Sequence, residues 1–223
     1  MDRGEREESS SSPSVNPRIR SIQERGTSGA LLQLSLDQGS SFFVAPELCD
    51  SGDRWIEIGA EISEERFSRL EQLDRETRCR KKALDLLARR SHSKMELKRK
   101  LVQRGFSGEL AERSCLWLMN KGFLDDRDFA RNWVDRQTVK GGISRRQMER
   151  KLQEKGISRE IISEMLSGHS EEMEWDALIK LLEKQLSRSG MTEKRAVQSL
   201  LRRGFSLTLI RRGLEKITGG EPC

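Results

Sequence analysis

The sequence predicts a mainly α-helical protein, in which tandem three-helix repeats form an elongated, curved array behind a small N-terminal β-rich segment. Two observations lead to this fold class, the composition and an internal repeat. Of the 223 residues, 34% are hydrophobic and 35% are charged, which suits thin helical layers better than a thick globular core. Aromatic residues make up 5%, Tyr is absent and only 4 Pro occur, so an all-β domain is disfavoured.

The internal repeat lies in the C-terminal two-thirds of the chain. The segments Ser93–Ser107 and Ser144–Ser158 align without a gap, and Thr192–Ser206 aligns with them more weakly. A glycine recurs in each copy at intervals of 51 and 48 residues: Gly105, Gly156 and Gly204. A unit of this length with three short helices buries little apolar surface alone, so we expect neighbouring units to pack against one another.

The N-terminal part is predicted to contain a tail followed by a small sheet. Residues 1–16 are polar and Ser-rich, which predicts a disordered tail. Residues 17–62 form a predicted β-rich domain, with strands at Arg18–Ile22, Ala30–Leu36 and Ser41–Val44 separated by Gly-containing turns at 26–29 and 37–40. A helical turn is expected at Pro46–Leu48, and Trp55–Ile62 is either a fourth strand or a loop.

The remainder is predicted to be helical. Ser63 begins a connecting helix over 63–82, whose pattern runs on into Ala83–Leu87. Three-helix repeats follow at 83–124, 125–168 and 169–217, with a C-terminal tail at 218–223. Their first helices are expected at Ala83–Arg90, Asp125–Lys140 and Trp175–Ser187.

Each repeat carries its own helix start and stop signals. Full capping boxes are expected from Ser93 with Glu96 and from Ser144 with Gln147. The recurring glycines suit the left-handed position that follows a helix, and the next N-caps are Ser107, Ser158 and Ser206. Between the first two repeats, Gly122 ends one helix and Asp125 caps the next, with Asp126 and Asp128 in its first turn.

Apolar spacing selects a set of core candidates. They are Leu97, Leu101, Phe106, Phe123, Phe129, Trp133, Leu152 and Leu200. Trp117 and Trp175 could serve as base-stacking platforms, but aromatic residues within helical stripes more often belong to the core.

Charge is divided unevenly along the chain. Residues 1–74 contain 8 Lys and Arg against 15 Asp and Glu, a net charge of −7, whereas residues 75–223 contain 34 against 21, a net charge of +13. The basic part therefore suits a polyanion, or an assembly that contains one. Surface candidates for this contact are Lys98, Arg99, Lys100, Arg145, Arg146, Arg150 and Lys151, with Arg202, Arg203, Arg211 and Arg212 as a separate cluster. Arg104, Lys155 and Arg203 stand where they would first complement the ends of their own helices.

Several classes of function are disfavoured. Four widely spaced cysteines indicate cytosolic thiols rather than a disulfide framework or a zinc site. His92 and His169 have no local ligand partner, so we expect surface or capping roles and no metal. No catalytic constellation or phosphate loop is present, which predicts a protein that is not an enzyme and needs no cofactor. No apolar run is long enough to span a bilayer, so we expect a cytoplasmic protein that does not bind a membrane. We also expect it to be a monomer.

Several motifs in the helical part form a distinctive set. They are Gly122–Asp126, Phe129–Ala130, Trp133–Val134, Lys140–Ile143, Arg146–Gly156 and Arg202–Phe205. Together, over roughly residues 75–216, they resemble the RecX family of bacterial regulators of the RecA recombinase.

The resemblance implies tandem three-helix modules that bind the RecA filament on DNA. It implies inhibition of the filament's ATPase, strand-exchange and coprotease activities, and thereby control of homologous recombination, DNA repair and the SOS response. Contact with single- or double-stranded DNA would be weak and independent of sequence. We expect the array to lodge in the filament groove, where it blocks protomer movement or extension and favours disassembly.

Two alternatives remain. Each repeat contains two helices joined through a Gly turn, which is compatible with a helix-turn-helix protein that reads duplex DNA. The second helices are rich in Lys and Arg but poor in the Asn and Gln that read bases, which counts against this alternative. The other alternative is a helical-repeat adaptor for an unrelated acidic protein.

Overall fold

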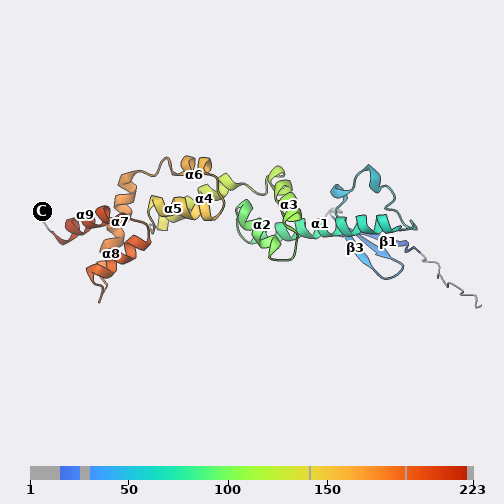
Figure 1. The fold of residues 1–223 in the computed structure, drawn as a ribbon, viewed down its shortest axis with the longest axis horizontal. Coiled ribbons are helices and arrows are strands. Elements are labelled where there is room, and N and C mark those ends of the chain that lie inside the picture. The colour runs from blue at the N-terminus through green and yellow to red at the C-terminus, as the bar shows by residue number, and fades with distance from the viewer. Residues whose placement is uncertain (1–15, 26–30, 141, 189, 220–223) are drawn as a thin grey trace, which may run out of the picture. The chain divides into compact units, whose positions relative to one another are not determined.

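The chain consists of a small sheet unit and a larger helical unit. The computed structural model describes residues 16–25, 31–140, 142–188 and 190–219. One compact unit ends at Lys81 and the other begins at Lys82. The described residues form three strands, two 3-10 helices and nine α-helices (Figure 1). The predicted fold class, a mainly α-helical protein with tandem three-helix repeats behind a small β segment, is confirmed.

The sheet unit contains the three predicted strands in antiparallel order β1-β2-β3. Their bounds are Ile19–Arg25, Leu31–Leu36 and Ser41–Val44. Residues 1–15 of the expected tail at 1–16 and the expected turn at 26–29 lie outside the described residues. Pro46–Leu48 forms the expected helical turn, η2, and η3 follows at Ser51–Asp53. The ambiguous segment Trp55–Ile62 is a loop, in which Glu61 forms an isolated β-bridge with Arg18, just before β1.

The long helix α1, Glu64–Arg89, directly follows Ser63, whose Oγ accepts from Arg66 N at 3.4 Å. It packs Leu70 and Leu73 against the apolar residues of the sheet (Figure 1). Asp74 and Thr77 also accept hydrogen bonds from Phe43 N and Ala45 N, at 2.7 and 2.9 Å. The helix therefore satisfies backbone donors on the outer edge of β3, which would otherwise be open to another strand.

The connecting helix and the first helix of the first repeat form one continuous helix, because α1 runs without interruption across the boundary expected at residue 82. The helices that follow in the first repeat are α2 Lys94–Val102 and α3 Gly108–Asn120. The second repeat contains α4 Asp126–Lys140, α5 Arg145–Glu154 and α6 Arg159–Leu166. The third contains α7 Glu171–Leu186, α8 Glu193–Arg202 and α9 Leu207–Thr218.

The expected N-caps are in place, but the full capping box expected from Ser144 with Gln147 is wrong, because Ser144 N donates to the Arg203 carbonyl instead. Hydroxyl oxygens accept from the backbone in the first turn of six helices, at Ser93, Ser107, Ser144, Ser158, Thr192 and Ser206. Asp125 accepts from Arg127 N at 2.7 Å and from Asp128 N at 3.3 Å. The start expected for the first helix of the third repeat, Trp175, is wrong. Helix α7 begins four residues earlier because Ser170 caps it and three glutamates occupy its first turn.

The core prediction is confirmed at six of eight positions. Leu97, Leu101, Phe129, Trp133, Leu152 and Leu200 are buried. Phe106 is only partly buried, and Phe123 is 59% exposed. The prediction for Phe123 is wrong because Gly122, at φ +75°, turns the chain, and Leu124 occupies the core instead.

Neighbouring repeats touch through two of the three predicted glycines. Gly105, Gly156 and Gly204 have φ values of +88°, +79° and +89°. A Cβ at Gly156 would lie 2.5 Å from Met95 Cβ in the preceding repeat, and a Cβ at Gly204 would lie 2.5 Å from Ser144 Oγ. At Gly105 it would meet nothing within 4 Å. Gly156 and Gly204 are thus required for two reasons: their backbone is left-handed, and the preceding repeat lies too close for a side chain.

This difference predicts unequal losses of stability. Gly105→Ala should lower the free energy of unfolding by about 1 kcal/mol, the cost of a left-handed L residue. Gly156→Ala and Gly204→Ala should each cost roughly 1–3 kcal/mol more, because a methyl group overpacks the contact between repeats. Urea unfolding followed by circular dichroism measures all three, and equal losses would contradict the junction contacts.

Candidate functional site

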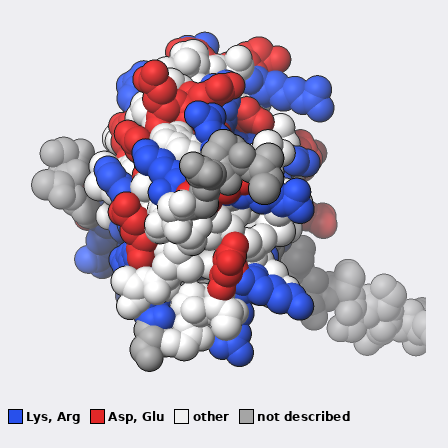
Figure 2. Space-filling view, turned by 90° about the vertical axis from the view of Figure 1, so that its left-hand side faces the viewer, with Lys and Arg blue, Asp and Glu red and all other residues white. Residues whose placement is uncertain are grey.

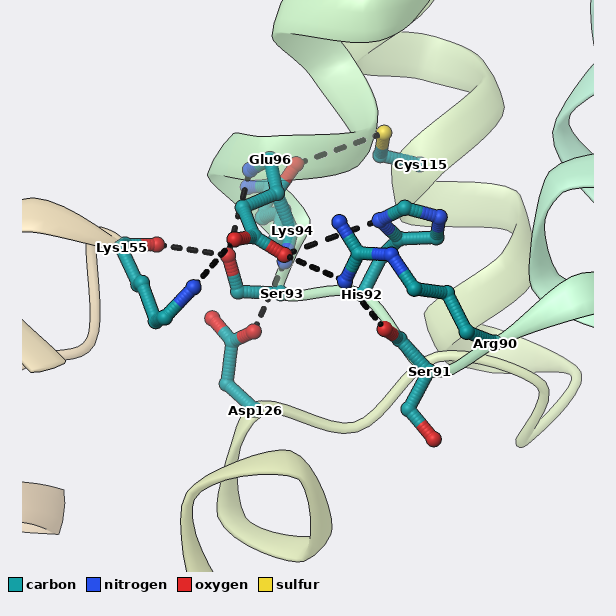
Figure 3. A network of polar contacts seen from close by, with 9 residues as sticks. All are labelled: Arg90, Ser91, His92, Ser93, Lys94, Glu96, Cys115, Asp126 and Lys155. Carbon is teal, nitrogen blue, oxygen red and sulfur yellow. Dashed lines mark hydrogen bonds and ion pairs between the residues drawn. The ribbon is translucent and has the colours of Figure 1, made fainter. Parts of the chain in front are cut away.

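The first junction joins the N-terminus of α2 to the turn that follows α5. Ser93 Oγ accepts from Glu96 N at 3.1 Å and donates to the Lys155 carbonyl at 2.6 Å, so one hydroxyl both caps a helix and joins two repeats (Figure 3). Asp126 Oδ1 accepts from Lys94 N at 2.8 Å. The second repeat therefore supplies a cap to a helix of the first, a role that the sequence did not predict for Asp126.

A cluster of charges surrounds this junction, with the Glu96 carboxylate at its centre. Lys155 Nζ lies 2.5 Å from it and Arg90 lies 3.3 Å from it (Figure 3). Burial opposes ionisation, but the hydrogen bonds and charges of Lys155 and Arg90 hold the pKa of Glu96 below its usual value. The expected capping box is therefore wrong in its second half, because the Glu96 side chain binds these cations.

His92 lies beside the same carboxylate, with its Nδ1 3.6 Å from Glu96. Burial, together with the charges of Arg90 and Lys100, lowers the pKa of His92. Of the surface or capping roles expected for the histidines, the surface role is wrong, because His92 and His169 are only 2% and 8% exposed.

The second junction repeats this arrangement with different groups. Ser144 N donates to the Arg203 carbonyl at 3.0 Å, and the Arg203 guanidinium donates to the Gly142 carbonyl at 2.9 Å. Lys155 and Arg203 occupy equivalent positions and reach the preceding repeat, rather than complementing the ends of their own helices. Arg104 does complement its own helix end, through the Lys100 carbonyl at 2.9 Å.

A groove lies at each junction. The first groove, of about 590 Å³, is bordered by Met95, Lys98, Arg99 and Val102 of α2 and by Gly156 of the next repeat. On its wall, Glu112 of α3 lies 2.6 Å from Lys94 and 2.7 Å from Lys98. Hydrogen bonds from these two lysines lower the pKa of Glu112.

The second groove is larger and more basic. It has a volume of about 900 Å³ and lies between α5 and the α8–α9 turn. Arg146 and Arg150 border it from α5, and Arg202 borders it from α8. Exposed apolar side chains, Leu201 and Leu207, complete the α8–α9 side.

The structure thus brings together only part of the predicted basic set. Lys98 and Arg99 meet at the first groove, and Arg146, Arg150 and Arg202 meet at the second. Lys100 and Lys151 lie outside both grooves on partly exposed positions. On the face drawn in Figure 2, basic and acidic side chains are interspersed around an uncharged band rather than gathered in one patch.

Other members of the basic set have local structural partners. Arg145 lies 3.5 Å from Glu149 and donates to the His169 carbonyl at 3.1 Å. Arg212, on the same helix as exposed Arg211, lies 4.9 Å from the centre of the Trp175 ring. Trp175 also packs against the core of the third repeat, which supports its structural role.

The junction residues were not predicted as site residues. Met95, Glu112 and Gly156 border the first groove, and Gly204 borders the second. The recurring glycines were the only signal in the sequence, and they indicated a helix end rather than a contact. Among the described residues, no helix is both long and apolar enough to cross a membrane.

Together, the fold and the paired grooves define a helical-repeat protein whose candidate site is a binding surface repeated at successive junctions. Residues 79–115 match the model of the first three-helix domain of RecX, and residues 125–166 match that of the second. The regulatory protein RecX of Mycobacterium ulcerans is 34% identical over 141 residues, which cover 60% of this chain and 82% of that protein. RecX of Mycobacterium leprae is 34% identical over 143 residues, covering 61% and 84%. The chain belongs to the RecX family of regulatory proteins.

Two solved structures support the fold. A crystal structure of regulatory protein RecX has a TM-score of 0.69 and 20% identity, covering 88% of this chain and 99% of that one. RecX from Lactobacillus salivarius has a TM-score of 0.55 and 19% identity, covering 65% and 97%. Both likenesses concern the arrangement of the backbone.

The charge cluster predicts a pH-dependent contribution to stability. Because the pKa of Glu96 is lowered on folding, its contribution is present above the unfolded value of about 4.3 and is lost as the pH falls through the folded value. Glu96→Gln should therefore lower the free energy of unfolding by about 1–2 kcal/mol at pH 7, with the difference shrinking below about pH 4.

Urea unfolding at a series of pH values measures this effect. Glu109→Gln is the matched control, because Glu109 lies 3.0 Å from Arg113 but its side chain is 82% exposed. A loss for Glu96→Gln that is the same at pH 7 and pH 3.5 would contradict the assignment.

Proposed function

We propose that this protein binds the RecA filament on DNA and inhibits its ATPase, strand-exchange and coprotease activities. Membership of the RecX family carries the proposal. The paired junction grooves support it, because a surface that recurs along the chain suits a partner that is itself repetitive.

A mechanism follows from the way in which the repeats are joined. The Ser93 hydroxyl and the Ser144 backbone N–H each donate a hydrogen bond to a carbonyl of the following repeat, so the first and second grooves are presented on a connected frame. Two attachments on one frame raise the effective concentration of the second contact and hold both partner sites at once. Lodged in this way, the protein would restrict movement or extension of filament protomers and favour disassembly.

The second groove is the best candidate for contact with nucleic acid. Arg146 and Arg202 have no carboxylate partner among the described residues, and Arg150 lies 3.6 Å from Glu154 in an exposed pair. Guanidinium groups bind phosphate oxygens through paired hydrogen bonds, and such contacts read no bases. Binding to naked DNA would therefore be weak and independent of sequence.

Titration of DNA-dependent ATP hydrolysis tests the proposed function directly. Added well below one copy per recombinase protomer, the protein should inhibit hydrolysis by the cognate RecA filament, since one bound copy impedes several protomers. Inhibition only at amounts that saturate the naked DNA would indicate competition for DNA. No inhibition at stoichiometric amounts would favour the duplex-binding or adaptor alternative.

Salt dependence tests the role of the second groove. The slope of log affinity for oligo(dT) against log salt concentration is negative. In Arg146→Gln/Arg150→Gln/Arg202→Gln, this slope should become less steep by about 2, since each lost phosphate contact removes about 0.7 from its magnitude. Fluorescence anisotropy between 50 and about 200 mM KCl, the range over which such affinities change steeply, gives the slope. A control variant replaces three exposed arginines outside both grooves, Arg131, Arg136 and Arg159, with Gln. Equal changes in the two variants would refute a localised site.

A further inference from the structure

The two junction grooves share a frame but differ in side chains. Each is bordered by the second helix of one repeat and by the left-handed glycine of the next. In the alignment of the repeats, three positions in the first groove correspond to three in the second: Met95 to Arg146, Arg99 to Arg150 and Val102 to Gln153. Since the frame is the same, these differences decide what each groove accepts.

The first groove has apolar surface open to solvent. Val102, at the C-terminal end of α2, is 45% exposed. Met95 lies against the backbone of Gly156, where an added Cβ would be 2.5 Å from its Cβ and 2.6 Å from its Cε. The thioether side chain thus contacts the next repeat while bordering the groove, and an apolar group placed there would lose contact with water.

The charge available in this groove is a single cation. Lys94 and Lys98 share the Glu112 carboxylate, so their charges are largely neutralised within the protein. Asp126 directs its carboxylate to the backbone N–H of Lys94. Arg99 is exposed and has no ion-pair partner among the described residues. One guanidinium group beside an apolar surface remains for a ligand.

This combination suits a protein surface better than a nucleic-acid strand. Successive phosphates attract several exposed cations. The second groove offers Arg146, Arg150 and Arg202, of which Arg150 shares an exposed ion pair with Glu154. The first groove offers one. Apolar contacts next to an arginine are typical of the energetically dominant centre of protein–protein interfaces. Its volume of about 590 Å³ exceeds that of a single side chain.

We propose that the first junction groove docks a protein segment in which an apolar side chain stands beside a carboxylate. Val102 and Met95 receive the apolar side chain, and Arg99 binds the carboxylate. The inference rests on the proposed function, because it takes this segment to lie on the recombinase protomer. The first groove then contacts the protein part of the filament, and the second groove contacts its phosphates.

Matched substitutions at equivalent positions separate the two contacts. Arg99→Gln/Val102→Gln alters the first groove, and Arg150→Gln/Gln153→Ala alters the second at the same helical positions. Binding of each variant is measured by anisotropy to naked oligo(dT) and to cognate RecA filaments assembled on oligo(dT) with a slowly hydrolysed ATP analogue. Circular dichroism checks that both variants keep the helicity of the parent.

The first-groove variant should bind the filament at least about tenfold more weakly and keep its affinity for naked oligo(dT) within about twofold, as expected for the loss of an interface centre. The second-groove variant should lose affinity for naked oligo(dT). Arg99→Glu should weaken filament binding more than Arg99→Gln, because it opposes the partner's carboxylate.

The outcomes distinguish the inference from the proposed function. If the parent protein inhibits the ATPase but the first-groove variant binds filaments like the parent, the docking site is refuted and the proposed function stands. A first-groove variant that loses affinity equally for filament and naked DNA also refutes it. If the parent protein binds no filament and inhibits nothing, the proposed function itself is refuted.

Discussion

The helical unit depends on the close backbone contact between successive repeats. A three-helix unit of about fifty residues buries too little apolar surface to be stable alone. In the first junction, the Ser93 hydroxyl bonds to the Lys155 carbonyl and Gly156 lies against Met95. Such an approach is open only to a residue without a side chain, and the left-handed turn makes the same demand. One glycine therefore ends a helix and joins two repeats.

The contact between repeats also determines which basic residues bond within the protein and which remain exposed. Lys155 and Arg203 follow equivalent helices and reach back to the preceding repeat, so their charges stabilise the frame. Lys98 is held by Glu112 within its own repeat. Arg99, Arg146 and Arg202 remain exposed at the grooves. The net charge of the helical unit thus overstates the charge available to a partner, and a repeated frame can carry different chemistry at each junction.

The sheet unit shows a similar use of side chains to satisfy backbone groups. Asp74 and Thr77 accept from the outer edge of β3. The guanidinium of Arg69 binds Asp53 at 2.6 Å, and this hydrogen bond lowers the pKa of the carboxyl group. In both units, polar residues that local patterns place on a helix surface bond to segments far away in the sequence.

The sequence by itself determined the fold class, the three strands and nearly every helix start, because capping, turn geometry and apolar periodicity act within a few residues. It also marked the glycines that recur from repeat to repeat. The tertiary structure alone decided that Phe123 is exposed, that Glu96 binds Lys155 instead of closing its capping box, and that Arg146 and Arg202 meet at one groove. The reason is distance along the chain. Whether a charged side chain faces solvent or a neighbouring repeat depends on residues about fifty positions away. A local sequence pattern contains no information about those residues.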